Sequence, residues 1–324
     1  MKALLLVLLS LGLILQQQPA MAGVTYPVLY VLANGSADPY PLDCGTSTST
    51  PCRKIASAVT LAKDYATTTI KVAQGNYTEN IHITETLPVS LSAQLAIEGG
   101  WNADFTAQSH DPSLTRVTSS TDNPILNMSI GGLGSVDLRL AYFTFQGLTD
   151  SQRQGFAVSA NSSTIGLVVD HCQLVSFRGQ AISLYADNNS AMTVTVNDTL
   201  IEGNFQWPID TPWPGAGVSA NSYALSTLNL TMTKNKIMGN LGSSGGGLSL
   251  NVSGAGSSLN AVLENNILAG NQAIVEGGAI LATTADSAEM ELHMTILPSA
   301  IIRRPPRRMA SPYSQLAAQP SPLI

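Results

Sequence analysis

The stretch Leu268-Ala-Gly-Asn271, followed by Gly277-Gly-Ala-Ile280, decides the fold of this chain because it is repeated. Earlier copies are Ile237-Met-Gly-Asn240 with Gly246-Gly-Leu248 at the same offset, and Ile201-Glu-Gly-Asn204 with Gly215-Ala-Gly-Val218 after an insertion. The three asparagines lie 36 and 31 residues apart, which is the range of solenoid repeats. Each repeat of a solenoid stacks on its neighbours, so most repeated residues are expected to serve stacking rather than chemistry.

Each repeat also contains two short runs typical of strands. One begins with a polar pair, as in Asn265-Asn-Ile267, and the other follows the glycines, as in Leu248-Ser-Leu250. Runs of three to five residues with no helical period between them predict a parallel β-helix, in which strands of adjacent turns pair about 4.8 Å apart. We expect the repeated asparagines in left-handed turns, hydrogen-bonded as a ladder, and the glycine pairs at positive φ where the chain bends.

Residues 1–22 are predicted to be a signal peptide. Lys2 precedes an apolar run from Ala3 to Leu15, and Ala20 and Ala22 frame a small-residue cleavage site. The run has 13 residues, fewer than the roughly 20 that a membrane-spanning helix needs. We therefore expect a protein that is secreted to the extracellular space or the outer cell surface, without a membrane span in the mature chain.

Residues 23–100 are predicted to form an N-terminal module with a capping helix and the first coils. Thr50 suits the N-cap of a helix and Pro51 its first position. The apolar positions that repeat at helical spacing are Ile55, Ala58, Val59 and Ala62. A solenoid has an open apolar end, and we expect this short helix to cover it.

The chain has three cysteines. Cys44 and Cys52 bracket a polar loop and can close a disulfide in an oxidising compartment. Cys172 follows an apolar run and is expected to be a buried core residue rather than a reactive thiol.

Residues 101–297 are predicted to form the coils, and residues 298–324 a disordered or aberrant tail. The Asn/Gly pattern stops near Ile296, and six of the 17 prolines lie between Pro298 and Pro322. Adjacent prolines such as Pro305-Pro306 cannot continue a central strand. A frame change in the coding sequence, or truncation of a longer solenoid, would account for this loss of pattern.

Charged residues make up 11% of the chain, against about 25% in ordinary globular domains. The formal net charge is −6, and an arginine cluster at residues 303–308 contributes +4, so residues 1–302 carry −10. This balance argues against nucleic acid as a partner.

Two parts of the chain resemble known families. Leu268-x-x-Asn271 with Gly277-Gly-Ala-Ile280 resembles the repeat of polymorphic outer-membrane proteins. Three N-terminal stretches resemble the first module of secreted proteins of the pectin-lyase-like superfamily, namely Pro51–Val59, Ile70–Glu79 and Glu98–Trp101. The resemblance implies an all-β, right-handed parallel β-helix with a short N-terminal capping helix. It leaves the activity open, because that superfamily contains lyases, hydrolases, esterases, adhesins and proteins without known activity.

Val168-Val-Asp-His-Cys172 resembles the Asp-His strand of pectate lyases, which makes Asp170 and His171 weak candidates for catalysis. Arg303-Arg-Pro-Pro-Arg-Arg308 formally fits the Arg-x-Pro-x-x-Arg loop of these lyases but lies in the patternless tail. The four histidines are scattered, without metal-ligand spacing. We expect no metal and no cofactor; Ca²⁺ would be required only if the protein were such a lyase.

The insertion Gln206–Pro214 interrupts the repeats and holds two of the three tryptophans between prolines. Solenoids place binding residues in such loops, and an exposed Trp suits the apolar face of a sugar ring. Trp207, Asp210 and Trp213 are therefore candidate ligand-binding residues. The alternative is that both tryptophans fold back onto the coil.

These observations predict a non-catalytic, secreted or cell-surface β-helix that binds an extracellular glycan or protein. One alternative is a carbohydrate-active enzyme, pectate-lyase-like or a glycosidase, that acts on acidic polysaccharide. Another is a truncated fragment of an adhesin or passenger domain. The enzyme would need two acids, or an acid and a base, converging on neighbouring coils.

Overall fold

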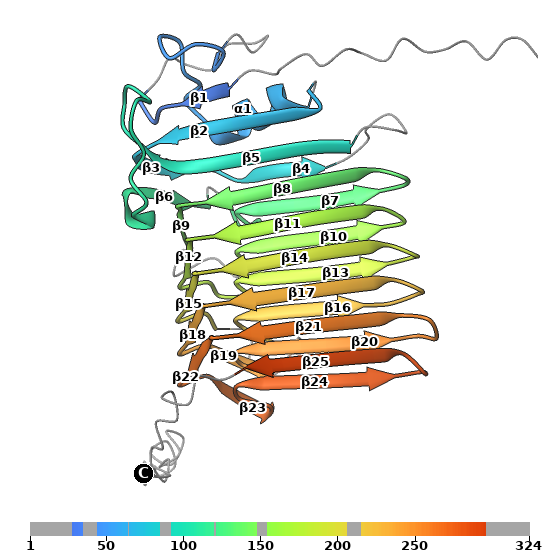
Figure 1. Ribbon diagram of the computed structural model, residues 1–324. Coiled ribbons are helices and arrows are strands. Elements are labelled where there is room, and N and C mark those ends of the chain that lie inside the picture. Colours follow the sequence, from blue (N-terminus) through green and yellow to red (C-terminus); the bar gives the residue numbers. More distant parts are fainter. Residues whose placement is uncertain are drawn as a thin grey trace, which may run out of the picture.

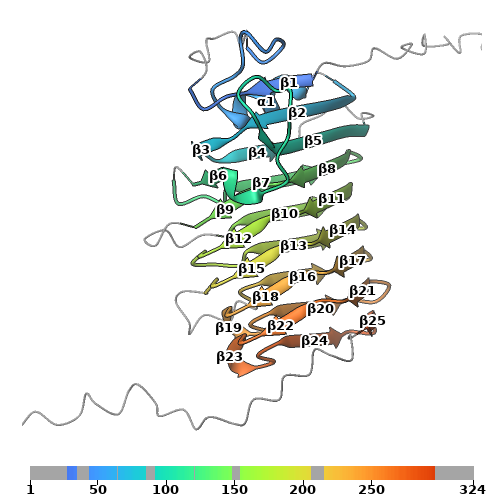
Figure 2. The ribbon, with the colours of Figure 1, turned by 60° about the vertical axis from the view of Figure 1, so that its left-hand side comes forward.

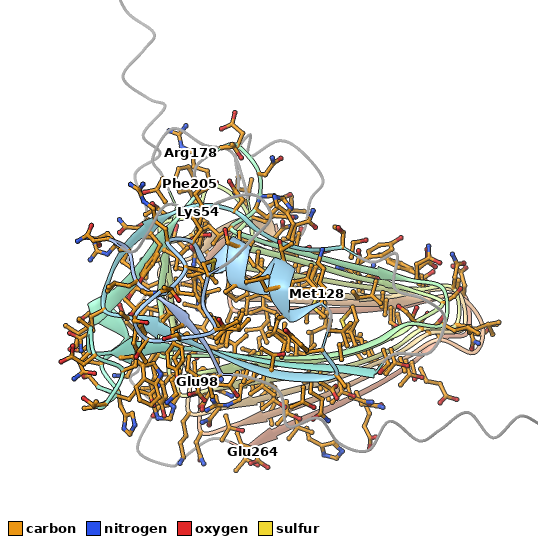
Figure 3. The ribbon with its side chains drawn as sticks, turned by 90° about the horizontal axis from the view of Figure 1, so that it is seen from above. Lys54, Glu98, Met128, Arg178, Phe205 and Glu264 are labelled. Atoms are coloured by element: carbon orange, nitrogen blue, oxygen red, sulfur yellow. A yellow bond between two sulfur atoms is a disulfide. The ribbon has the colours of Figure 1, made fainter. Side chains whose placement is uncertain are left out.

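The computed structural model describes residues 28–34, 44–63, 65–84, 92–119, 121–147, 154–205 and 215–295. Within these ranges the chain forms a column of stacked coils whose strand ladders are parallel (Figure 1). Seen from the N-terminal end, the chain turns clockwise as it recedes, so the coil is right-handed (Figure 3). The architecture is the right-handed parallel β-helix that the sequence predicts.

Each full coil contributes one strand to each of three sheets, here called A, B and C (Figure 2). Sheet A has nine strands: β1 (Val28–Val31), β2 (Thr67–Ala73), β5 (Ser92–Trp101), β8 (Ser135–Ala141), β11 (Thr164–Asp170), β14 (Ala191–Asn197), β17 (Thr227–Thr233), β21 (Ser258–Glu264) and β25 (Glu289–Thr295). Sheet B has seven short strands: β3 (Gly75–Thr78), β6 (Thr115–Thr118), β9 (Thr144–Gln146), β12 (Gln173–Val175), β15 (Leu200–Glu202), β18 (Lys236–Met238) and β22 (Ile267–Ala269).

Sheet C lies opposite sheet A across the core (Figure 3). Its seven strands are β4 (Ile81–Thr84), β7 (Leu126–Gly131), β10 (Phe156–Asn161), β13 (Ile182–Asp187), β16 (Val218–Ser222), β20 (Leu248–Ser253) and β24 (Ile280–Ala285). A small fourth sheet pairs β19 (Leu241–Ser244) with β23 (Gln272–Glu276). The helices are α1 (Ile55–Ala62) and the 3-10 turn η1 (Pro112–Leu114).

Strand alternation fills the core. On β17, Leu228, Leu230 and Met232 are buried while the residues between them are half-exposed, as period-2 side-chain geometry requires. The register stacks like positions, so that Leu230 lies between Val194 and Ala261. The interior is therefore a set of apolar columns that run along the axis.

The repeated asparagines form the expected ladder inside the coil. The side-chain oxygen of Asn240 accepts hydrogen bonds from the backbone N (3.1 Å) and side-chain amide (2.9 Å) of Asn204, and Asn271 does the same for Asn240. The expected left-handed conformation of these asparagines is wrong. The left-handed conformation is instead adopted by the glycine before each asparagine, namely Gly203, Gly239 and Gly270, with φ between 62° and 65°. The asparagine side chains themselves point inward, where they reach the next coil.

The strand register of the glycine pairs differs by one residue from the match between repeats that is counted from the repeated asparagines. Leu248 pairs with Ile280, which aligns Gly245, rather than Gly246, with Gly277. The cause is a register shift between Gly242 and Ser244, where β19 meets β23. Positive φ occurs where this turn bends, at Gly245 (64°) and Gly277 (68°). Among the glycine pairs the expectation is therefore confirmed at Gly277 and wrong at Gly246, Gly247 and Gly278, which have no positive φ.

The N-terminal helix exists but begins later than predicted. Cys52 pairs with Val31 in an isolated bridge, so the residues around Pro51 are extended and α1 starts at Ile55 with Lys54 as its N-cap. Neither Thr50 nor Lys54 caps it through a side chain. The carboxylate of Glu79 accepts from the backbone N of Ile55 (3.0 Å) and of Ala56 (2.8 Å) instead. The predicted apolar face of the helix is buried at all four positions.

The disulfide between Cys44 and Cys52 is present, and Cys172 is free and buried, as expected. Sheet A runs from β2 through β5 to β8 across the predicted boundary at residue 100. The predicted signal peptide (residues 1–22) and tail (298–324) lie outside the described residues. No helix within the described ranges is long and apolar enough to cross a membrane.

Candidate functional site

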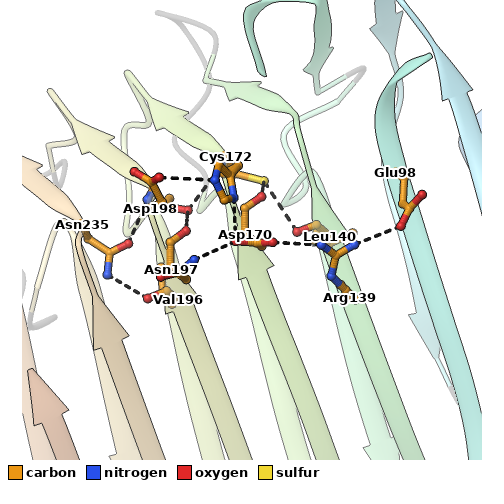
Figure 4. A network of polar contacts seen from close by, with 11 residues as sticks. Glu98, Arg139, Leu140, Asp170, Cys172, Val196, Asn197, Asp198 and Asn235 are labelled. Atoms are coloured by element: carbon orange, nitrogen blue, oxygen red, sulfur yellow. Dashed lines mark hydrogen bonds and ion pairs between the residues drawn. The ribbon is translucent and has the colours of Figure 1, made fainter. Parts of the chain in front are cut away.

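Asp170 and His171 lie at the end of β11, where sheet A turns into sheet B. The Asp170 carboxylate accepts hydrogen bonds from Arg139 Nη2 (2.9 Å) and Asn197 Nδ2 (2.9 Å), on the two neighbouring strands (Figure 4). His171 Nδ1 lies 2.8 Å from the same carboxylate. The structure thus joins both predicted residues to side chains of two adjacent coils.

The network extends to a second carboxylate through Arg139. Ala141 occupies the register position between Glu98 and Asp170. Its small side chain leaves room for the guanidinium of Arg139, which binds Glu98 Oε1 at 3.0 Å and Asp170 Oδ2 at 2.9 Å. Arg139 is therefore fixed between two acids, each one strand away.

The ring of His171 is also held on both sides. Its Nε2 lies 3.3 Å from Asp198 Oδ2. Its centroid lies 5.4 Å from that of Tyr142, which stacks in turn on His110 at 4.7 Å. The residue sits at a turn position with φ of 51°. Since each nitrogen faces a carboxylate, neither can take a proton from a substrate without losing a contact.

Burial alone would raise the pKa of Asp170, but hydrogen bonds from Asn197, His171 and Arg139 and the charge of His171 together lower it below its ordinary value. The carboxylate is therefore ionised at neutral pH. This protonation state suits an ion-pair partner and does not suit a general acid. Beneath it, burial raises the pKa of the Cys172 thiol to about 12, so that thiol is protonated and poorly nucleophilic.

A shallow groove of about 400 Å³ lies beside the network, on the outer face of sheet A from β2 to β14. Its outward lining combines polar side chains with the apolar Ala96 and Val168, and most of its surface is apolar. The polar side chains are Thr67, Thr69, Gln94, Asp137, Arg139, Thr193 and Thr195. Gly166 lies on its floor, where an added Cβ would stand 2.1 Å from Asp137 Oδ1. The carboxylate of Asp137 therefore lies across Gly166, in the groove.

A larger hollow of about 530 Å³ lies at the N-terminal end, where its lining includes Arg53, Lys54 and Glu79. Glu79 is already engaged by the first two backbone amides of α1. This hollow is therefore tied to the capping of the helix.

Other predicted site residues remain untested. Trp207, Asp210 and Trp213, and the arginines from Arg303 to Arg308, lie outside the described residues. In the described part of the chain, no group of three His, Cys, Asp or Glu side chains is placed to hold a metal ion.

Sequence reasoning missed Arg139, Glu98, Asn197 and Asp198. The available signal was a charged residue at an outward position of an apolar strand, as in Val136-Asp-Leu-Arg-Leu140. Joining these residues requires the lengths of the coils, which vary: Arg139 lies 31 residues before Asp170, and Asn197 lies 27 after it.

A search of curated proteins and a search of solved structures give no significant match to the chain. One family model, described as "Protein of unknown function (DUF1565)", matches residues 42–290. This match covers well over half of the chain, and the protein therefore belongs to the DUF1565 family.

Proposed function

We propose that this protein is an exported, non-catalytic β-helix that binds a neutral polysaccharide along the groove of sheet A. The observation that carries the proposal is a groove in which hydroxyl, amide and charged side chains edge an apolar surface, beside a network whose ionisable groups are already paired. A disulfide between Cys44 and Cys52 is compatible with an oxidising compartment outside the cytoplasm, and the predicted signal peptide gives the route.

The chemistry of the groove suits sugar hydroxyls. Asp137 accepts hydrogen bonds, Arg139 donates them, and the threonine hydroxyls do both. Arg139 is held by Glu98 and Asp170, so ordering it on binding costs little side-chain entropy. The acidic charge of residues 1–302 disfavours a polyanionic ligand, which leaves a neutral glycan as the best match.

A steric block tests the groove. Thr195 lines it, on β14, and Thr195→Trp is expected to fill it and weaken glycan binding by roughly tenfold or more, about 1.4 kcal/mol. Val262→Trp is the matched control, because Val262 stands in the same outward row two strands further along, outside the lining. Binding is measured on a glycan array and then by calorimetry.

Equal binding by wild type, Thr195→Trp and Val262→Trp would remove the groove as the site. Selective capture of a protein instead of any glycan would point to the other class of partner. Trp207→Ala and Trp213→Ala test the loop prediction separately, since a loss there with an intact groove would place recognition in residues 206–214.

One observation favours the alternative that the protein is an enzyme. Asp170 and His171 share one network with a cationic residue, Arg139, and a second acid, Asp198. The test is release of unsaturated product from polygalacturonate with Ca²⁺, compared between wild type and His171→Ala. Activity that disappears in the variant would overturn the non-catalytic proposal.

A further inference from the structure

Two tyrosines form an exposed aromatic pair on the outer face of sheet C, the face opposite the groove. Tyr185 projects outward from β13 and is 44% exposed. Its ring centroid lies 5.2 Å from that of Tyr223, with 42° between the ring planes. Tyr223 follows β16, in the turn toward β17. The two rings are therefore adjacent and tilted toward each other rather than stacked.

The pair does not serve the core. The outward positions that flank Tyr185 in register are Ser159 and Asn221, followed by Asn251 and Thr283. Asn221 in this row is buried, whereas the ring of Tyr185 leaves apolar surface in contact with water. Together with Tyr223 it offers an exposed aromatic surface on which a ligand can pack.

Tyr223 is held in place by a chain of amides. Its hydroxyl accepts from Asn251 Nδ2 (2.6 Å) and donates to Asn221 Oδ1 (3.4 Å). Asn221 donates in turn to the carbonyl of Leu184 (3.1 Å), and Asn251 accepts from Thr283 (3.0 Å). The ring is thus pre-organised, which lowers the entropic cost of binding a ligand against it.

Acceptors and donors surround the two rings. Asp187 stands two positions after Tyr185 on β13, so both side chains project from the same face of the sheet. Burial and then the charge of Asp187 raise the pKa of Tyr185. Asn188 donates to Asn161 at 3.2 Å on the neighbouring coil. Flat aromatic faces with carboxylate and amide groups at their edge suit a sugar ring, because its C–H face packs on the π-cloud and its hydroxyls meet the polar rim.

We propose that Tyr185 and Tyr223, with Asp187 and Asn251 at their edge, form a second binding site for the pyranose rings of a neutral glycan. This inference goes beyond the groove of sheet A and stands independently of it. If both sites are occupied, one molecule holds glycan on its two broad faces and bridges separate chains, which raises avidity without new contacts.

The test isolates this site in a Thr195→Trp background, where the groove is blocked. The probes are cellohexaose, mannohexaose and xylohexaose, titrated by calorimetry. At least one is expected to bind, and Tyr185→Ala should weaken it roughly tenfold or more. Tyr185→Phe should restore binding because it keeps the ring, and Ser159→Ala, in the same row, should leave it unchanged. Circular dichroism confirms that each variant is folded.

Two results would overturn the proposal: no binding of any of the three hexasaccharides in the Thr195→Trp background, or binding that survives Tyr185→Ala. Neither depends on the groove. Conversely, Thr195→Trp that binds as well as wild type while Tyr185→Ala abolishes binding would reject the groove and retain this site.

Discussion

Asp170 accepts from three donors at once, on its own turn and on both neighbouring strands. Its pKa lies below the ordinary value of about 3.9. A depressed carboxyl pKa contributes stability that is complete well above pH 4 and is lost as the pH falls through that value toward the folded pKa. The network is therefore a stabilising element at neutral pH, whatever ligand the neighbouring groove binds.

Asp170→Asn is expected to lower the free energy of unfolding by about 1–3 kcal/mol at pH 7, since it removes the charge that Arg139 and His171 face. At pH 3 the difference from wild type should shrink, because the wild-type carboxyl is then losing its own charge. Urea unfolding followed by circular dichroism at both pH values measures this. Asp122→Asn, at an exposed carboxyl, is the control. If the difference in stability between wild type and Asp170→Asn were as large at pH 3 as at pH 7, the depressed pKa of Asp170 would be contradicted.

At the scale of the element, the asparagine ladder links coils in a way that apolar columns cannot. Asn240 is fully buried and bonds to Asn204, Asn271 and the carbonyl of Ile201. Asn240→Ala leaves the backbone N of Asn204 without its acceptor and removes one of the two hydrogen bonds of the Asn204 side-chain amide, so we expect a cost of roughly 2–4 kcal/mol. The matched control is Asn229→Ala on the outer face of β17, where one side-chain bond from Asn260 is lost and the cost should stay below about 1 kcal/mol. Similar decreases in the thermal unfolding temperature for both variants would mean that the buried hydrogen-bond ladder contributes no more stability than the single outer bond.

The same elements mark how far sequence could go. Spacing of Ile55, Ala58, Val59 and Ala62 predicted the buried face of α1 because it depends only on local period. The predicted start of the helix was wrong because the side chain that caps it, Glu79, lies 24 residues after the first helical residue. The Arg139–Asp170 network escaped prediction for the same reason: contacts between coils depend on coil lengths that no local pattern encodes.

At the scale of the whole molecule, each coil is stabilised by the coils beside it, so a residue's contribution depends on how many described coils flank it. The described coils end at β25, and several apolar side chains of the last turns are exposed: Ile267, Ile274, Val275, Leu292 and Met294. Leu230 and Leu292 occupy the same interior column, separated by Ala261. They differ in exposure, at 1% and 36%, because within the described ranges coils flank Leu230 on both sides and Leu292 on one side.

This pair gives a direct test of the column. Leu230→Ala should lower the free energy of unfolding by about 2–5 kcal/mol, because it opens a cavity between two coils. Leu292→Ala should cost less than about 1 kcal/mol, since much of that side chain already meets water. Urea titrations of the full chain measure both. Equal losses of stability would mean that the last described coil is covered in solution, either by another part of this chain or by a second molecule. Size-exclusion chromatography over a range of protein concentrations would distinguish these explanations, because only association with a second molecule depends on concentration.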